Sequence, residues 1–141
     1  MIEIEYKTKE EIFAQAQKIL NKRLREVISK EAIETIESQI GGYGMKRKGF
    51  LGDLIEKYFF EINPGNISEP DFTIAGVELK TTPLKGHTKN TYASKERLVF
   101  SMINYDEIVN ETWLKSSFLE KNKILLLMFY LWAQNQSILD Y

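Results

Sequence analysis

A continuous apolar run near the end of the chain limits the fold more than any other feature. The run KILLLMFYLWA covers residues 123–133 and carries no charge after its first lysine. A strand that is apolar on both faces is typical of the centre of a sheet whose two faces are covered. The run is also too short to cross a bilayer. We therefore predict a buried central strand here, together with elements that cover it.

Helical periodicity before this run supplies elements that can cover a sheet. Apolar residues recur three or four positions apart from Lys9 to about Gln39, and residues 31–39 are expected to form a second short helix. Residues 50–62 form the apolar stripe of a further helix, which the turn residues NPGNISEP end. A hairpin within residues 68–83 and a strand over residues 96–104 follow. Helices followed by strands predict an α/β (α+β) fold with a sheet flanked by helices.

Composition places the chain among globular proteins of one domain. Of its 141 residues, 43% are hydrophobic and 28% are charged, which is enough apolar material for a core. The lack of cysteine excludes a disulfide framework and a cysteine-based zinc site. The charged start of the chain has no apolar signal core, so we expect a cytoplasmic protein without a membrane segment. The net charge of −1 is not the basic balance typical of nucleic-acid binders.

The stretch SEPDFTIAGVELKTTP, residues 68–83, carries charged residues within an otherwise apolar hairpin. A two-residue turn at Ala75–Gly76 would close this hairpin, although alanine is not a favoured first residue of such turns. Side chains alternate across a strand, so two sets of residues separate onto opposite faces. The expected polar face holds Asp71, Thr73, Glu78 and Lys80, and the expected core face holds Phe72, Ile74, Val77 and Leu79.

Two carboxylates and an ammonium group on one sheet face suit the hydrolysis of phosphodiesters. Carboxylate oxygens bind hard cations such as Mg²⁺, which activates a bound water and offsets the charge of the transition state. A lysine beside the metal can orient the water or stabilise the phosphate. The alternative is a solvated Glu–Lys pair on an ordinary sheet face, worth about 0–1 kcal/mol. The tripeptide E-x-K alone does not decide between the two.

A longer pattern around this hairpin resembles a known family. The segments KRKGFLGDLIEKYF (46–59) and SEPDFTIAGVELKTTPL (68–84) are similar to MutH and the GATC-cleaving type II restriction endonucleases related to it. In that family a K-G-x-x-G-x-x-(L/I)-E helix precedes a P-D…G-V-E-L-K hairpin. The resemblance covers most of the chain from about residue 10 onward. It implies a restriction-endonuclease-like mixed sheet flanked by helices, with a PD-(D/E)xK core.

The resemblance also implies an activity, a cofactor and a partner. The activity is the Mg²⁺-dependent cleavage of double-stranded DNA at GATC sites, with Mn²⁺ as a substitute metal. Asp71 and Glu78 would be metal ligands together with the carbonyl of Leu79, and Lys80 would be the catalytic lysine. The site residues implied in addition are Glu56 as a further catalytic and metal-binding carboxylate, and Lys48, Ser116 and Lys121 as DNA-binding residues.

Several alternatives remain open from the sequence. The same fold could serve as a non-catalytic DNA-binding or effector domain, and an interaction domain of another class would carry the acidic hairpin as a plain polar face. Residues 1–141 are expected to form a single domain, the N-terminal catalytic part of a longer protein or a unit of a homo-oligomer. The basic segments MKRK, LKGHTK and SKER are solvated loops or phosphate contacts, and His87 is expected to be solvated in a loop. Gly52 indicates close approach of a backbone or of DNA.

Overall fold

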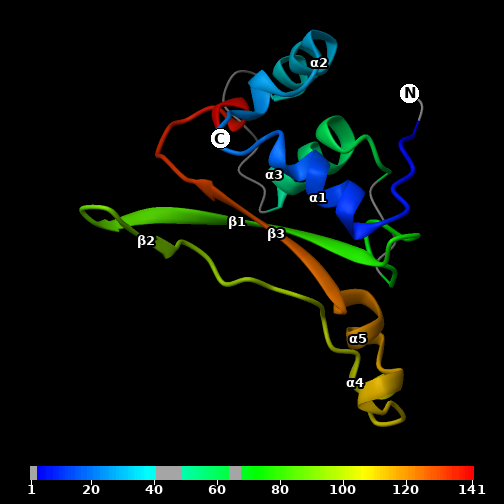
Figure 1. The fold of residues 1–141 in the computed structure, drawn as a ribbon. Coiled ribbons are helices and arrows are strands. Elements are labelled where there is room, and N and C mark those ends of the chain that lie inside the picture. Colours follow the sequence, from blue (N-terminus) through cyan, green and yellow to red (C-terminus); the bar gives the residue numbers. More distant parts are fainter. Residues whose placement is uncertain (1–2, 41–48, 64–67) are drawn as a thin grey trace.

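Three strands form one mixed sheet at the centre of the molecule. The computed structural model describes residues 3–40, 49–63 and 68–141. Strand β1 (Val77–Thr88) lies between β2 (Thr91–Ser94) and β3 (Ile124–Leu131). It pairs antiparallel with β2 and parallel with β3. Most helices lie on one side of this sheet, which confirms the predicted mixed sheet flanked by helices (Figure 1).

The periodic segment at the start of the chain forms two separate helices. Helix α1 (Lys9–Gln17) begins at a capping box in which the Thr8 hydroxyl accepts from the Glu11 backbone N–H at 3.2 Å. After a turn, a short 3₁₀ segment η1 (Leu24–Glu26) leads to α2 (Lys30–Ile40). The second helix predicted for residues 31–39 is therefore confirmed.

The helix predicted over residues 50–62 changes its hydrogen bonding halfway. It begins as α3 (Phe50–Leu54) and continues directly as a π-helical turn η2 (Ile55–Phe59). The Phe60 N–H donates to the Ile55 carbonyl at 2.9 Å, the i to i+5 bond of a π-turn. Such turns hold an extra residue and are frequent at functional sites. Here the π-turn contains Glu56.

The hydrophobic core lies between the helices and the inner face of the sheet. Val77 and Leu79 of β1 point into it, and Phe60 is completely buried. Burial of apolar area on this scale is the main favourable contribution to folding. The buried cluster consists of Ile12, Leu24, Ile36, Phe50, Leu51, Leu54, Ile55, Phe59, Phe60, Ile62, Phe72, Val77, Leu79 and Leu139.

The apolar run forms strand β3, but the prediction that this strand is central and buried was wrong. In the described part of the chain β3 is an edge strand, and β1 occupies the centre. Leu126 and Met128 pack against the core, whereas Leu127, Phe129 and Leu131 are 40%, 58% and 54% exposed. A run that is apolar on both faces predicts a strand, but it carries no information on which strands pair with it.

The strand predicted for residues 96–104 was also wrong. Residues 97–104 have no regular secondary structure, and Met102 is 94% exposed. The physical reason is that β1 continues outward to Thr88, beyond the expected hairpin, and turns back into β2. The outer half of β1 therefore pairs with residues 91–94, and His87 lies in a strand instead of the predicted loop, although it is exposed as expected.

Short helical segments connect β2 to β3 and follow β3 at the end of the described chain. α4 (Tyr105–Ile108), η3 (Trp113–Lys115) and α5 (Ser117–Asn122) precede β3, below the sheet in Figure 1. After β3, η4 (Ile138–Asp140) returns to the helical side. None of the helices in the described ranges is long and apolar enough to cross a membrane.

The C-terminal segment is fixed to the helical side by both backbone and side-chain contacts. The Leu24 N–H donates to the Tyr141 carbonyl at 2.8 Å. Arg25 binds Asp140 through Nε at 2.5 Å and through Nη2 at 3.2 Å, a two-point pairing that defines orientation. This attachment places residues 132–141 opposite α3, where they form one wall of the groove described below.

Candidate active site

The turn before β1 determines where the acidic side chains lie. Phe72 and Val77 exchange two backbone hydrogen bonds, of 2.9 and 3.3 Å, around a four-residue turn, residues 73–76. Gly76 has a φ of 68°, a conformation that favours glycine. The predicted two-residue turn at Ala75–Gly76 was therefore wrong by two positions of register. Ile74, predicted in the core, lies in the turn and is 57% exposed.

This register shift keeps Asp71, Glu78 and Lys80 on one face of the hairpin. Side chains alternate with a period of two, so a shift by two positions returns each remaining residue to its predicted face. Asp71 now lies opposite Glu78, and its N–H donates to Glu78 Oε2 at 3.2 Å. Its own Oδ2 accepts from the Leu79 N–H at 2.8 Å. Thr73, which belonged to the predicted polar face, lies in the turn instead.

Aromatic packing fixes the backbone that carries Asp71. The ring of Phe72 meets the rings of Phe60 and Tyr6 edge-on, with centroid distances of 5.0 and 5.4 Å. The Tyr6 hydroxyl donates to the Phe60 carbonyl at 3.1 Å. Such edge-to-face pairs add about 0.5–1.5 kcal/mol each beyond the area that they bury. The residue next to Asp71 is thus anchored to the helix that carries Glu56.

Glu78 is a buried carboxylate that two lysines approach. It is only 2% exposed. Lys80 Nζ lies 2.8 Å from Glu78 Oε1, and Lys121 Nζ lies 3.7 Å from the same oxygen. A buried charge is costly unless it is paired, and here the two cations come from β1 and from α5. The resemblance placed Lys121 at the DNA, and the structure additionally joins it to Glu78.

Burial and the repulsion of nearby carboxylates raise the pKa values of Glu56 and Asp71. Burial, followed by the charges of Asp71, Asp53 and Glu78, raises the pKa of Glu56 to about 8, against an opposing effect of Lys80. Burial and the Glu78 charge raise the pKa of Asp71 to about 6, although the Leu79 hydrogen bond opposes this. Raised pKa values of neighbouring acids are typical of functional sites.

The donor set of the cluster fits a hard divalent cation. Mg²⁺ prefers oxygen ligands and keeps several waters, so one or two protein carboxylates suffice to hold it. Asp71 and Glu78 supply such oxygens, and a cation would relieve the repulsion that raises the pKa of Asp71. Within the described ranges, however, no three acidic or histidine side chains are grouped closely enough to hold a metal ion. The ligand roles of Asp71, Glu78, Glu56 and the Leu79 carbonyl all stay predictions.

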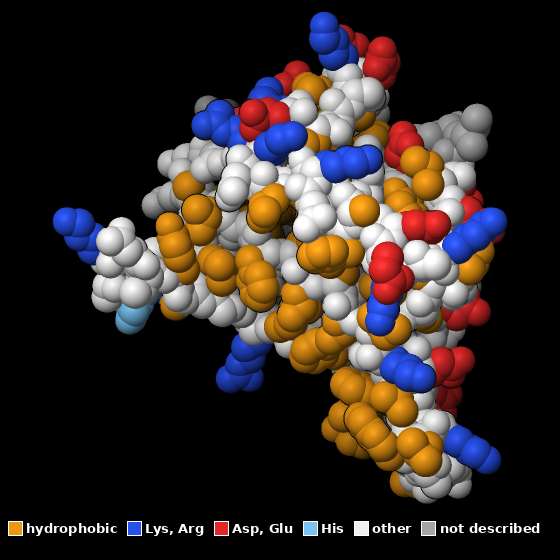
Figure 2. All heavy atoms as spheres, viewed as in Figure 1, with side chains coloured by type: hydrophobic (Ala, Val, Ile, Leu, Met, Phe, Trp, Pro, Cys, Tyr) orange, Lys and Arg blue, Asp and Glu red, His pale blue; other side chains and the backbone are white. Residues whose placement is uncertain are grey.

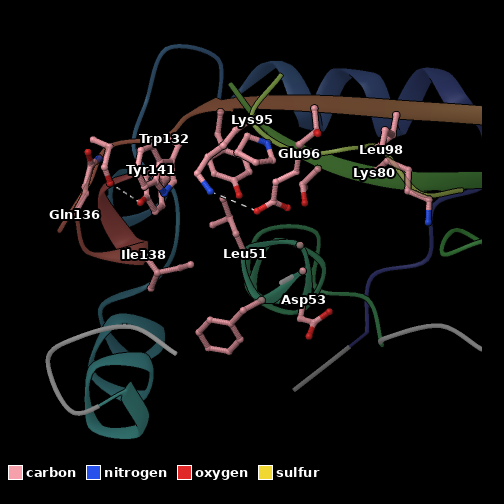
Figure 3. A pocket seen from close by; sticks show the side chains of 18 of the residues that line it. Leu51, Asp53, Lys80, Lys95, Glu96, Leu98, Trp132, Gln136, Ile138 and Tyr141 are labelled. Atoms are coloured by element: carbon pink, nitrogen blue, oxygen red, sulfur yellow. Dashed lines mark hydrogen bonds and ion pairs between the residues drawn. The ribbon is translucent and has the colours of Figure 1, made fainter. Parts of the chain in front are cut away.

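A groove with a volume of about 1190 Å³ opens beside this cluster, and both Glu56 and Lys80 line it. Its other walls are α3, residues 95–99 and the C-terminal segment. Figure 3 shows Leu51 of α3 pointing toward Lys95 and Glu96 across this space, whereas the Asp53 side chain points away from them.

Gly52 has a packing reason in this structure. A Cβ atom at this position would lie 3.1 Å from Thr81 Oγ1. The close neighbour among the described residues is therefore a side chain of β1 and not a backbone, and the approach of DNA to Gly52, which also lines the groove, stays a prediction. Gly52 lets α3 approach β1, and Glu56 follows one turn later.

The other predicted DNA-binding residues have different outcomes. The Ser116 hydroxyl donates to the Trp113 carbonyl at 2.8 Å and accepts from the Leu119 N–H at 3.1 Å. It is therefore the N-cap of the helix that carries Lys121, and its contact with DNA stays a prediction. Lys48 lies outside the described residues.

Helices against a mixed sheet, with an Asp–Glu–Lys cluster on the hairpin, define the restriction-endonuclease-like class of folds. The profile of the family described as DNA mismatch repair enzyme MutH matches residues 60–141. The chain belongs to the MutH family. It is similar to the type II restriction enzyme Sau3AI of Staphylococcus aureus, with 40% identity over 112 residues. That match covers 79% of this chain and 22% of the relative, so the chain spans about a fifth of the relative's length.

Proposed function

We propose that this chain is the catalytic domain of a Mg²⁺-dependent endonuclease that hydrolyses double-stranded DNA at GATC sites. The observation that supports this most is the arrangement of three side chains on one hairpin. Asp71 and Glu78 lie opposite each other, with the Asp71 backbone N–H donating to Glu78 Oε2 at 3.2 Å, and Lys80 Nζ is 2.8 Å from Glu78 Oε1. Membership of the MutH family and the similarity to a type II restriction enzyme support the same activity.

Each residue of the cluster has a role in this proposal. Asp71 and Glu78 would hold Mg²⁺, which when bound supplies a Lewis acid for the phosphate and lowers the pKa of a coordinated water. The Leu79 N–H fixes the orientation of the Asp71 carboxylate through its 2.8 Å bond. Lys80, which is 20% exposed, lies where an ammonium group can face both the carboxylate and a phosphate in the groove.

Lys121 and Glu56 complete the proposed site from neighbouring elements. Lys121 brings a second ammonium group to the buried end of the cluster, where its Nζ lies 3.7 Å from Glu78 Oε1. Glu56, with a pKa of about 8, holds a proton at neutral pH in the absence of other ligands. A carboxyl group in this state can exchange its proton with a water or a leaving oxygen in the groove. The GATC specificity in the proposal is supported only by the resemblance of the K-G-x-x-G and P-D…E-L-K motifs.

A cleavage assay tests the proposal directly. The protein is incubated with a GATC-containing duplex and with a duplex of scrambled site, each with Mg²⁺, Mn²⁺ or EDTA. We expect cuts at GATC with either metal, none in EDTA, and none by Asp71→Asn or Lys80→Gln. A charge-matched control, Lys123→Gln, changes an exposed lysine at the end of the same helix as Lys121 and should cut normally.

The same assay separates the second candidate function, a non-catalytic DNA-binding domain of the same fold. The ion pair between Lys80 and Glu78 argues against that candidate, because a domain without catalysis has no need for this buried charge pair. Retention of the duplex without cutting in either metal would overturn the nuclease proposal in its favour. Cutting that persists in the Asp71→Asn variant would overturn the assignment of the site.

A further inference from the structure

The outer half of the central strand projects from the body of the molecule as a two-stranded ribbon, which we call the basic arm (residues 84–94). Leu84 pairs with Ser94, and Lys85 pairs with Ala93, before the chain turns at Lys89 and Asn90. The inner part of β1 is buried, whereas residues 85–90 are exposed. Figure 1 shows this ribbon reaching beyond the helical layer and beyond the other strands.

The charge of this part of the chain differs from that of the whole. Residues 79–95 carry four lysines and the only histidine of the chain, and no acidic residue, in a protein of net charge −1. Within the described part of the chain no ion pair involves Lys85 or Lys89. Figure 2 shows lysine and histidine side chains at the outer end of the arm, with no acidic side chain beside them on this face.

The arm is a direct extension of the catalytic strand. Glu78 and Lys80 lie at the start of β1, and Lys85 follows on the same strand. With a rise of about 3.3 Å per residue, Lys85 lies about 16 Å from Lys80 along the strand and the turn lies about 30 Å away. One turn of B-DNA is about 34 Å long, and its major groove is about 12 Å wide, wide enough for a two-stranded ribbon. A duplex that is held at the cluster and runs along β1 would therefore pass close to the arm.

We infer that the basic arm binds the phosphate backbone of duplex DNA on one flank of the cleavage site, chiefly through Lys85 and Lys89. This inference rests on the proposed function, because the duplex at the cluster gives the arm its ligand. Lysine contacts to phosphate supply affinity and register without reading sequence. Exposed lysines also protect the edges of sheets against aggregation, a role that needs no ligand and predicts no dependence on DNA.

Binding measurements on the full chain separate these roles. We would measure the affinity for a 30-base-pair duplex containing GATC by fluorescence anisotropy at several salt concentrations, with Ca²⁺ in place of Mg²⁺. Lys85→Gln/Lys89→Gln is compared with the charge-matched control Lys22→Gln/Lys30→Gln, which changes two exposed lysines of the helical side. Loss of two phosphate contacts should reduce the slope of log K against log salt by about 1.8 and weaken binding roughly tenfold at low salt.

Two further readouts sharpen the test. Shortening the duplex to 8 base pairs around the site removes the flank, so it should weaken binding by the wild type but not by the Lys85→Gln/Lys89→Gln variant. Lys85→Arg/Lys89→Arg keeps the charge and should restore the slope. The cleavage rate at saturating DNA should stay within about twofold of the wild type, because the arm does not touch the reacting atoms.

The possible results divide cleanly. An unchanged salt slope in Lys85→Gln/Lys89→Gln, while the wild type still cuts DNA, would overturn the arm inference and leave the proposed function standing. An equal loss in the Lys22→Gln/Lys30→Gln control would also overturn it, because the effect would then be one of net charge. If the wild type neither binds nor cuts duplex DNA, the proposed function and the arm inference fall together.

Discussion

Asp71 accepts a hydrogen bond from the Leu79 backbone N–H through Oδ2, at 2.8 Å. This bond links the carboxylate to the strand that carries Glu78 and Lys80. Asp71 therefore has a structural contact that can be tested separately from its proposed role in catalysis. An amide at position 71 keeps an oxygen that can accept this bond, whereas a methyl group leaves the N–H without an acceptor.

We therefore expect Asp71→Asn and Asp71→Ala to differ in stability but not in activity. Asp71→Ala should lower the free energy of unfolding by about 1–3 kcal/mol, the cost of an unsatisfied buried donor, and Asp71→Asn by much less. Both should reduce cleavage by at least about 100-fold, because the proposed function assigns Asp71 as a metal ligand. Urea denaturation in EDTA and a cleavage time course measure the two effects. Equal stability losses in the two variants would show that the Leu79 bond contributes nothing.

Lys121 offers a second prediction because it reaches Glu78 from another element. Its Nζ is 3.7 Å from Glu78 Oε1, while Lys80 Nζ is at 2.8 Å. Since Lys80 remains, Lys121→Gln should lower the free energy of unfolding by only about 1 kcal/mol, and it should slow cleavage. The neighbouring Lys123→Gln is the matched control and should change neither quantity.

A double-mutant cycle tests whether the effect of Lys121 passes through Glu78. In a Glu78→Gln background, Lys121→Gln should cost less stability than in the wild type, because the charge that it balances is gone. If the cost is the same in both backgrounds, Lys121 stabilises the fold through its helix and not through this carboxylate.

The raised pKa of Glu56, about 8 against its usual 4.5, predicts how stability changes with pH. Burial is the largest cause of this shift. The folded protein binds this proton more tightly than the unfolded chain, so the stabilisation from protonated Glu56 is full below pH 4.5. It is lost as the pH rises toward 8.

Glu56→Gln should therefore be more stable than the wild type at pH 8, by on the order of 1–2 kcal/mol after allowance for solvent screening, and nearly equal at pH 4.5. Urea denaturation in EDTA at both values measures this, with the exposed Glu34→Gln as the control. Mg²⁺ at pH 8 should stabilise the wild type more than Asp71→Asn by mass action. Equal pH dependence of Glu56→Gln and the wild type would contradict the assigned burial of this acid.

The sequence predicted the site better than it predicted the sheet around it. Asp71, Glu78 and Lys80 were placed on one face although the predicted turn was wrong, because an error of two residues leaves strand faces unchanged. Lys121 lies more than 40 positions from Glu78, and only the packing of α5 on β1 joins them. No local pattern reports such a contact, and the resemblance alone pointed to that residue.

The misplaced strands show where local patterns lose information. The run that forms β3 is as apolar as a central strand, yet Phe129 faces outward. Residues 97–104 are apolar enough to predict a strand, but β1 takes residues 91–94 as its partner. The segment LKGHTKN has the glycine and polar residues of a loop, and it extends β1 because pairing with β2 satisfies its backbone. In each case the structure of a segment depends on which strand pairs with it, and its own sequence does not determine that pairing.

The contact between Gly52 and Thr81 gives a last prediction, which links packing to catalysis. A Cβ atom at position 52 would lie 3.1 Å from Thr81 Oγ1, so Gly52→Ala forces α3 and β1 apart by a few tenths of an ångström. Alanine also favours the helix by about 1 kcal/mol, so the two effects nearly cancel in stability.

Activity has no such compensation, because Glu56 follows Gly52 by one turn and moves with it. We expect Gly52→Ala to slow cleavage by about tenfold or more with little change in the free energy of unfolding, since small displacements of catalytic groups are costly. Thr81→Ala removes the obstructing atoms. The double variant Gly52→Ala/Thr81→Ala should therefore cut DNA nearly as fast as Thr81→Ala alone, and much faster than Gly52→Ala. Cleavage rates and urea denaturation of the four proteins in this cycle provide the measurement. A double variant as slow as Gly52→Ala would mean that position 52 acts through another contact, such as one with the substrate in the groove.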